Sequence, residues 1–176
     1  RKKMNIAPDV FVTLLLSGGN GVGPMLEILK ALEKASFPLV AIAVCGHNNG
    51  LFLEIERFRK QASIQIINMA FVDNVDELMS CADVYIGKAG GISSSEGLAK
   101  ELPCIFVNPI PGQERANADH LTGVGACLEI RDVSQILGIV SALRSSDDKM
   151  AVLKKNIKET RRPGAASEIA DIAEKL

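Results

Sequence analysis

The sequence predicts an α/β fold in which helices cover both faces of a parallel sheet. Six short apolar runs alternate along the chain with segments of helical length, and the runs are not interrupted by a polar residue at every second position. Strands buried on both faces have this continuous apolar pattern, and parallel neighbours need a crossover connection, which is usually a helix. We therefore expect a doubly wound, Rossmann-like sheet of six strands in the order 3-2-1-4-5-6.

Each element follows from a local pattern. The run at residues 10–16 is the first expected strand, and Pro24 then suits the first turn of a helix whose apolar residues recur at helical spacing. The other strands are expected at 39–45, 64–68, 84–87, 104–107 and 126–130. The helices between them are expected at 24–35, 49–61, 76–80, 94–101 and 114–122. After the sixth strand only helices are expected, at 133–145, 147–159 and 165–175.

The chain divides by composition into three parts. Residues 1–9 are polar and contain Pro8, which predicts an interdomain linker. Residues 10–146 are expected to form one ligand-binding domain, and residues 147–176 a highly charged helical tail that folds back over a neighbouring domain. Because the chain begins with Arg1 and not with methionine, we expect it to be a piece of a longer protein, with a separate subunit as the alternative.

Charge and cysteine content narrow the class of partner and compartment. The formal net charge of -1 gives no general attraction to nucleic acid, so no nucleic-acid partner is expected. The four cysteines include no Cys-x-x-Cys pair and lie in or beside apolar runs, and the two histidines are far apart. This favours buried reduced thiols and no metal site. Reduced thiols in turn predict a reducing, cytoplasmic location. No apolar run reaches the about 18 residues that a membrane-spanning helix needs.

A glycine-rich turn, residues 17–24, follows the first expected strand. It is neither the G-x-G-x-x-G fingerprint in register nor a P-loop, because no Gly-Lys-Ser/Thr follows. The second strand ends in Cys45-Gly46-His47, without an acidic residue to hold an adenosine ribose, so NAD is disfavoured. We expect the turn to cradle phosphate or to approach a sugar closely. The residues of this expected loop are Ser17, Gly18, Gly19, Asn20 and Gly21.

The stretch from Lys88 to Leu98 follows the fourth expected strand and contains two adjacent glycines, three serines and then Glu96. Glycines let the backbone approach a ligand, and the N–H groups at the start of the next helix are free to bind an anion. Glu96, further along the helix, is placed to accept hydrogen bonds from a sugar diol. The stretch therefore predicts an anion cradle beside a sugar-nucleotide site.

Two further loops follow the third and fifth strands. Phe71 could cover a flat base while the main chain of Val72 pairs with it, but Phe71 could equally pack internally beside a helix cap at Asp73 or Asn74. Gln113 and Glu114 stand at the start of a helix after a rigid loop with two prolines. Their amide and carboxylate suit sugar hydroxyls, with helix capping as the alternative.

Taken together, these stretches resemble the donor half of GT-B glycosyltransferases of the family that contains the lipid II-forming N-acetylglucosaminyltransferase. The likeness is closest to monogalactosyldiacylglycerol synthases and processive diacylglycerol glucosyltransferases. It covers nearly the whole chain in the right order. The residues that carry it are 18–24, 71–73, 82–83, 88–96 and 111–117. Two departures are mild: Ala89 stands where these enzymes often have proline, and Ser93 where they often have threonine.

The resemblance implies a role for each site residue. Phe71 and the backbone of Val72 would hold uracil, and Glu96 would accept from the ribose hydroxyls. The diphosphate would meet Gly91, Ile92 and Ser93, with the glycine loop and Lys88 beside it. The residues that would read the sugar are Gln113, Glu114 and Asn117.

The same resemblance implies an inverting transfer of a hexose or N-acetylhexosamine from a UDP-sugar to a lipid or glycolipid acceptor, without metal or cofactor. The general base would lie in an N-terminal half that this chain lacks, so the catalytic residue is not expected here and the chain would bind a UDP-sugar without turnover. A peripheral position on the inner face of a membrane would follow. The resemblance does not choose between glucose, galactose and N-acetylglucosamine.

Three alternatives remain open beside this interpretation. Retaining GT-B enzymes often carry two glutamates eight positions apart, but Lys88 stands eight before Glu96. UDP-N-acetylglucosamine 2-epimerases share the fold but would need an acid at Ser95. A non-catalytic donor-binding subunit that docks on a membrane partner is the third.

Overall fold

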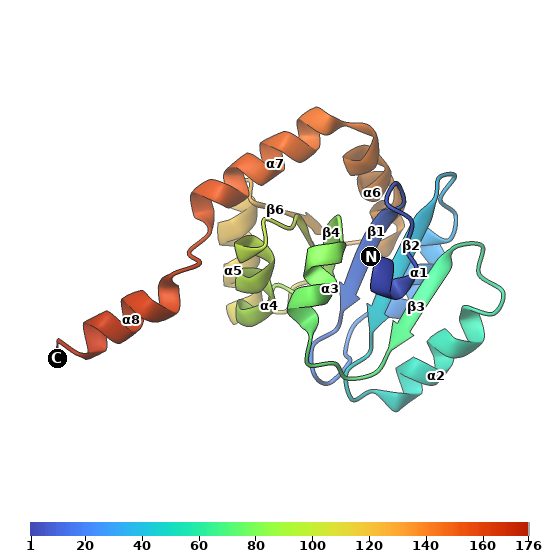
Figure 1. Cartoon of the computed structure of the whole chain (residues 1–176), viewed down its shortest axis with the longest axis horizontal. Coiled ribbons are helices and arrows are strands. Elements are labelled where there is room, and N and C mark those ends of the chain that lie inside the picture. Colours follow the sequence, from blue (N-terminus) through green and yellow to red (C-terminus); the bar gives the residue numbers. More distant parts are fainter. Residues whose placement is uncertain (176) are drawn as a thin grey trace.

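The computed structural model describes residues 1–175 and confirms the predicted sheet. Six strands form one parallel sheet in the order β3-β2-β1-β4-β5-β6 (Figure 1). The strands are β1 (Phe11–Leu16), β2 (Leu39–Val44), β3 (Gln65–Met69), β4 (Val84–Gly87), β5 (Cys104–Val107) and β6 (Cys127–Ile130). Every residue of β1 and β2 is buried, as continuous apolar strands between two helical layers should be.

Helices cover both faces of the sheet. They are α1 (Met25–Leu32), α2 (Asn49–Phe58), α3 (Val75–Cys81), α4 (Gly91–Ala99), α5 (Gln113–Gly123), α6 (Ile136–Ser145), α7 (Asp147–Thr160) and α8 (Ala165–Ala173), with short 3-10 helices η1 (Lys2–Met4) and η2 (Val133–Gln135). On one face α1 contacts α2 and α6, and on the other α4 contacts α5 and α7 (Figure 1). The order of the strands reverses between β1 and β4, and ligands of such sheets bind at the carboxyl ends of the strands beside this point.

α1 and α2 each end three residues earlier than expected, at Leu32 and Phe58, and the change that bears on the site concerns α4. The helix begins at Gly91 and not at Ser94, because the two glycines do not form an open turn: Gly90 is the N-cap, and Gly91 already has helical geometry. Glycine is a poor helix former, so local propensity places the start too late. Residues 91–93 are thus the first turn of a helix.

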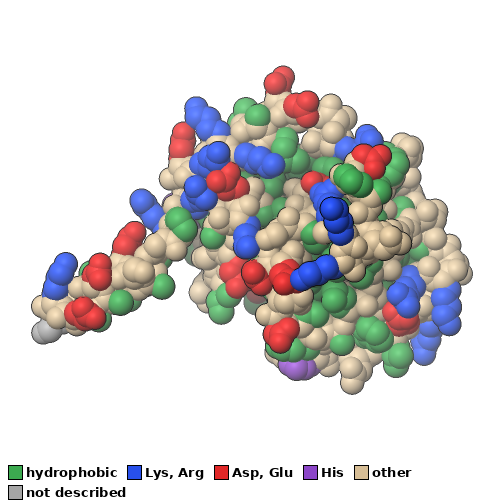
Figure 2. All heavy atoms as spheres, viewed as in Figure 1, with side chains coloured by type: hydrophobic (Ala, Val, Ile, Leu, Met, Phe, Trp, Pro, Cys, Tyr) green, Lys and Arg blue, Asp and Glu red, His purple; other side chains and the backbone are tan. Residues whose placement is uncertain are grey.

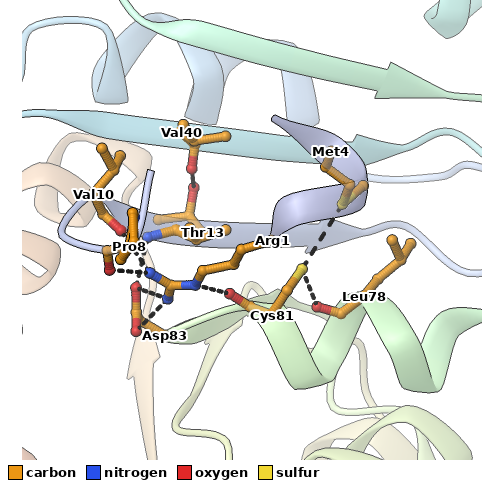
Figure 3. Close-up of polar contacts among 10 residues, drawn as sticks. Arg1, Met4, Pro8, Val10, Thr13, Val40, Leu78, Cys81 and Asp83 are labelled. Carbon is orange, nitrogen blue, oxygen red and sulfur yellow. Dashed lines mark hydrogen bonds and ion pairs between the residues drawn. The ribbon is translucent and has the colours of Figure 1, made fainter. Parts of the chain in front are cut away.

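Residues 1–9 pack against the domain. The Arg1 guanidinium donates to both carboxylate oxygens of Asp83, at 2.9 and 2.8 Å, and to the carbonyl oxygens of Cys81, Pro8 and Val10 (Figure 3). Asp83 also accepts from the backbone N–H of Val12 at 2.7 Å. The segment is therefore held at the amino ends of the central strands β1 and β4, opposite the carboxyl ends of the strands, and its use as a link between domains stays a prediction.

The expected tail consists of two different helices. α7 belongs to the core through Leu153 and Ile157, which are 5% and 0% exposed, and Glu101 accepts ion pairs from Lys158 and Arg161 beyond them. α8 contributes no buried residue and extends away from the rest of the molecule (Figures 1 and 2). Ile169 and Ile172 are exposed on this helix. Folding back over a neighbouring domain stays a prediction for the tail.

Candidate functional site

Two cavities open at the carboxyl ends of the central strands. The first, which we call the Phe71 cavity, has a volume of about 300 Å³. It brings together seven of the predicted site residues, which are Gly18, Gly19, Phe71, Val72, Ile92, Ser93 and Glu96. The second, the Lys88 cavity, has a volume of about 230 Å³, and its lining includes Ser17, Lys88 and Ile110. The predicted residues thus converge from distant parts of the chain at the point where the strand order reverses.

The start of α4 forms one wall of the Phe71 cavity. No side chain caps this helix, and Ser94 is the first residue whose N–H bonds back, to the Gly90 carbonyl oxygen at 3.0 Å. The amides of Gly91, Ile92 and Ser93 therefore belong to the unsatisfied first turn, where the helix dipole is positive. This end of the helix can accept an anion. Glu96 lies further along the same helix and lines the same cavity.

The glycine loop is held in place by the turn between β2 and α2. The His47 N–H donates to the Gly19 carbonyl oxygen at 2.8 Å, and the Asn48 side-chain amide donates to that of Gly21 at 2.9 Å. Gly46 makes this approach possible, because a Cβ there would lie 2.7 Å from the Gly18 carbonyl oxygen. The glycine loop is thus preorganised by a second loop. From the sequence, that second loop was assessed only as a candidate for binding NAD or a metal ion.

The other two residues of the expected loop, Ser17 and Asn20, differ in burial. The Ser17 side chain is buried, and its hydroxyl donates to the Val44 carbonyl oxygen at 3.4 Å. Asn20 is exposed at the tip of the loop. Of these two, only Asn20 has a side chain free to move toward a ligand.

His47 is a residue of the site that sequence reasoning missed. Its ring stacks on Phe71, with centroids 4.5 Å apart and an angle of 9° between the planes. Phe71 is 57% exposed and lines the cavity, so it does not pack internally. The position of His47 just after β2 could have predicted its place beside Phe71, which follows β3. Residues that follow adjacent parallel strands lie at the same end of the sheet.

Replacing His47 with alanine is expected to weaken UDP and uridine binding equally, by about threefold, because the stack that orients Phe71 is lost. Isothermal titration calorimetry with both ligands measures this. His120→Ala, which removes an exposed histidine from α5, is the matched control and should bind both as the parent protein does. Unchanged affinity of the His47 variant for both ligands would show that the stack does not orient Phe71.

The predicted sugar-reading residues lie at the start of α5, beside Lys88. Glu114 accepts from the Ile110 N–H at 3.4 Å, and its other oxygen lies 3.9 Å from Lys88 Nζ. The Gln113 amide lies next to Gly91, because its Nε2 is 3.3 Å from the position a Gly91 Cβ would take. The Asn117 amide donates to the Ala89 carbonyl oxygen at 2.9 Å. Glu114 and Asn117 therefore already hold local backbone, and Gln113 lies beside the start of α4.

A half-buried ion pair anchors α5 to the edge strand. Arg115 donates to both carboxylate oxygens of Glu129 on β6, at 2.8 and 2.6 Å, and it also pairs with Asp119. The hydrogen bonds from Arg115 hold the pKa of Glu129 below its usual value. Such a bidentate pair fixes both distance and orientation, so it sets where α5 begins relative to the sheet.

Comparison with known proteins identifies the family. Residues 24–176 match the model of the glycosyltransferase family 28 C-terminal domain. The chain belongs to this family. A processive diacylglycerol beta-glucosyltransferase of Bacillus mycoides is 33% identical over 171 residues, which are 96% of this chain and 44% of that protein. The enzyme of the same description from Bacillus subtilis is 31% identical over 159 residues, 90% of this chain and 41% of that one. This member of family 28 therefore spans less than half the length of these curated relatives.

Solved structures share the fold of this family 28 domain. The crystal structure of Acinetobacter baumannii MurG matches with a TM-score of 0.81 at 19% identity, over 99% of this chain and 52% of that chain. Medicago truncatula UGT71G1, solved as a complex with UDP-glucose, matches with a TM-score of 0.60 at 19% identity, over 86% of this chain and 35% of that chain. These likenesses confirm the predicted doubly wound, Rossmann-like fold.

The described part of this domain contains neither a cluster of metal ligands nor a helix suited to span a membrane. Among residues 1–175, no three histidine, cysteine, aspartate or glutamate side chains gather as a set of metal ligands. In the same residues, no helix combines the length and the apolar character that crossing a bilayer requires. The four cysteines are buried and unpaired, as the sequence predicted.

Proposed function

We propose that this chain is the UDP-sugar-binding half of an inverting glycosyltransferase that moves a hexose or N-acetylhexosamine to a lipid acceptor. The observation that carries the proposal is the Phe71 cavity. An exposed aromatic ring, the free amides at the start of α4 and the carboxylate of Glu96 surround one space of about 300 Å³. The aromatic ring can stack on a flat base, the free amides can bind an anionic diphosphate, and the carboxylate can accept hydrogen bonds from a ribose diol. Family membership supports the same assignment.

In this proposal the nucleotide lies across the carboxyl ends of β1 and β4. Uracil stacks on Phe71 and pairs with the backbone of Val72, Glu96 accepts from the ribose hydroxyls, and the diphosphate meets the amides of residues 91–93. The glycine loop closes over the phosphates from the opposite side. No metal is needed to bind the donor, because the helix dipole and Lys88 offset the diphosphate charge.

The sugar would then point toward the start of α5. Glu114 lies beside Lys88 and Gln113 lies beside Gly91 at the start of α4, which leaves both within reach of a hexose attached to the second phosphate. As the acceptor hydroxyl attacks the anomeric carbon, the bond to UDP breaks and negative charge grows on the leaving phosphate. Lys88, 3.9 Å from Glu114 in the free protein, can turn toward that charge.

The acceptor and the general base belong to the part of the enzyme outside this chain. Relatives at about a third identity are named diacylglycerol glucosyltransferases, which supports a lipid acceptor. The rim of the crevice is also apolar: Val22, Ile92 and Ile110 are 57%, 79% and 55% exposed there. We infer a cytoplasmic enzyme whose other half faces the membrane and supplies the base that activates the acceptor.

Calorimetry with the isolated chain tests the proposal. UDP should bind with a 1:1 stoichiometry, and the affinity should not change when EDTA is added, because protein groups alone hold the diphosphate. Incubation with UDP-glucose, UDP-galactose or UDP-N-acetylglucosamine and diacylglycerol should give no product until the remaining half of the protein is supplied. Absence of UDP binding would refute the proposal, and loss of binding in EDTA would refute its metal-free form.

A further inference from the structure

A single phenol group lies beneath the anion-binding turn. Tyr85, on β4, is 1% exposed, and its hydroxyl lies 3.1 Å from the Lys88 carbonyl oxygen and 3.4 Å from Ser93 Oγ. It is the only tyrosine in the sequence. The hydroxyl therefore joins three consecutive pieces of the site: the end of β4, the turn that follows it and the first turn of α4.

Gly87 makes room for this ring, and Gly97 lies on its other side at ordinary contact distance. A Cβ on Gly87 would lie 2.5 Å from the Tyr85 hydroxyl oxygen, and a Cβ on Gly97 would lie 3.9 Å from the ring atom Cδ1. The side chain thus runs under α4 between two positions without side chains. A buried phenol needs a hydrogen-bond partner, and here the partners are in the turn.

The hydrogen-bond directions follow from the chemistry of the partners. A carbonyl oxygen only accepts, so the one phenol hydrogen goes to Lys88, and the phenol oxygen is left to accept from the Ser93 hydroxyl. Burial raises the pKa of Tyr85, which keeps the hydroxyl protonated and able to donate. One group therefore orients both a carbonyl and a side chain of the site.

A second side chain holds the next carbonyl from the other direction. The Asn117 amide, on α5, donates to the Ala89 carbonyl oxygen at 2.9 Å. Two consecutive peptide groups, those that start at Lys88 and Ala89, are thereby fixed from β4 and from α5. The orientation of the following peptides, which carry the amides of Gly91 and its neighbours, depends on these two bonds.

We propose that Tyr85 is a positioning residue for diphosphate recognition. Its hydroxyl sets the turn from Lys88 to Gly90 so that the first amides of α4 and the Ser93 side chain face the ligand. This role rests on the proposed binding of a UDP-sugar. It requires no contact between Tyr85 and the ligand, and it is separate from the base-binding end of the site at Phe71.

Tyr85→Phe removes only the hydroxyl and is the direct test. We expect its Kd for UDP to rise about fivefold while its Kd for uridine stays the same, because only UDP carries the diphosphate. In the ligand-free protein, hydrogen exchange of the Ser94 amide, which donates to the Gly90 carbonyl oxygen, should become faster. Both measurements, with thermal unfolding to check the fold, are made on the chain as it stands.

Thr13→Val is the matched control. Thr13 is 0% exposed, and its hydroxyl donates to the Val40 carbonyl oxygen at 3.4 Å, so the variant also loses one buried hydroxyl-to-carbonyl bond. It lies within the β1–β2 pair, and it should change neither the UDP-to-uridine affinity ratio nor exchange of the Ser94 amide. Asn117→Ala loosens the same turn from α5 and should speed exchange of the same amide.

The outcomes separate this inference from the proposed function. If Tyr85→Phe weakens the binding of UDP and of uridine equally, or weakens neither, the positioning role is overturned. If the parent protein binds no UDP, the proposed function fails. The exchange comparison then still decides whether Tyr85 holds the turn, because it needs no ligand. Unchanged exchange in the phenylalanine variant would overturn the structural basis of the role.

Discussion

Replacing Glu96 with alanine is expected to raise the Kd for UDP by about 100-fold. In the proposed complex its carboxylate accepts hydrogen bonds from both ribose hydroxyls, and hydrogen bonds to a charged group contribute about 1.5–3 kcal/mol each. Glu96 is exposed and lines the Phe71 cavity, so the substitution should leave the fold intact. Calorimetry with UDP on both proteins gives the ratio directly.

Two controls make this measurement specific to the ribose. Ser95→Ala alters the neighbouring exposed residue, which does not line the cavity, and should bind UDP as the parent protein does. The 2′-deoxy form of UDP should bind the parent protein more weakly than UDP does, but Glu96→Ala should bind both forms equally. If the variant still discriminates between them, Glu96 does not read the ribose.

Replacing Gly87 with alanine is expected to lower the free energy of unfolding by about 3 kcal/mol. The added Cβ would lie 2.5 Å from the Leu16 carbonyl oxygen and 2.5 Å from the Tyr85 hydroxyl oxygen. Neither neighbour can move easily, because Leu16 pairs with Gly87 in the β1–β4 register and Tyr85 is buried. Urea unfolding followed by circular dichroism measures the change.

The same substitution at another glycine should have the opposite sign. Gly138 is an exposed residue of α6, and nothing lies within 4 Å of the position its Cβ would take. Gly138→Ala should therefore stabilise the protein by about 0.5–1 kcal/mol through helix propensity. A Gly87 variant as stable as the parent protein would mean that the sheet can open at this point, and the close approach at the end of β4 would not be essential.

Patterns along the chain were sufficient to predict the fold. Continuous apolar runs such as 39–45 predicted strands buried on both faces, and the connections between them predicted a parallel sheet, which the structure confirms. The strand order then placed the turns after β1 and β4 on either side of one crevice. The Phe71 cavity indeed has Gly18 and Gly19 on one side and Ile92 and Ser93 on the other.

The contacts within that crevice could not be predicted in the same way. The stack of His47 on Phe71 joins loops after different strands, and the Arg115–Glu129 pair joins α5 to β6. Each depends on rotamers and on the separation of two elements, which no local pattern specifies. Helix propensity even placed the start of α4 at Ser94, because it contains no information on the contacts that stabilise a helix from Gly91.

The sequence by itself therefore determined the parallel sheet and the order of its strands, because apolar periodicity and glycine-rich turns are local patterns along the chain. The resemblance of its loop motifs indicated the family, which the family model confirms. Only the tertiary structure decided what holds the turn from Lys88 to Gly90. In the sequence, Tyr85 looks like one more apolar residue of a buried strand. Its hydroxyl gains the Lys88 carbonyl oxygen as a partner, and Asn117 gains that of Ala89, only when β4, α4 and α5 pack together. A buried polar group must find its partner, and the partner is chosen by packing.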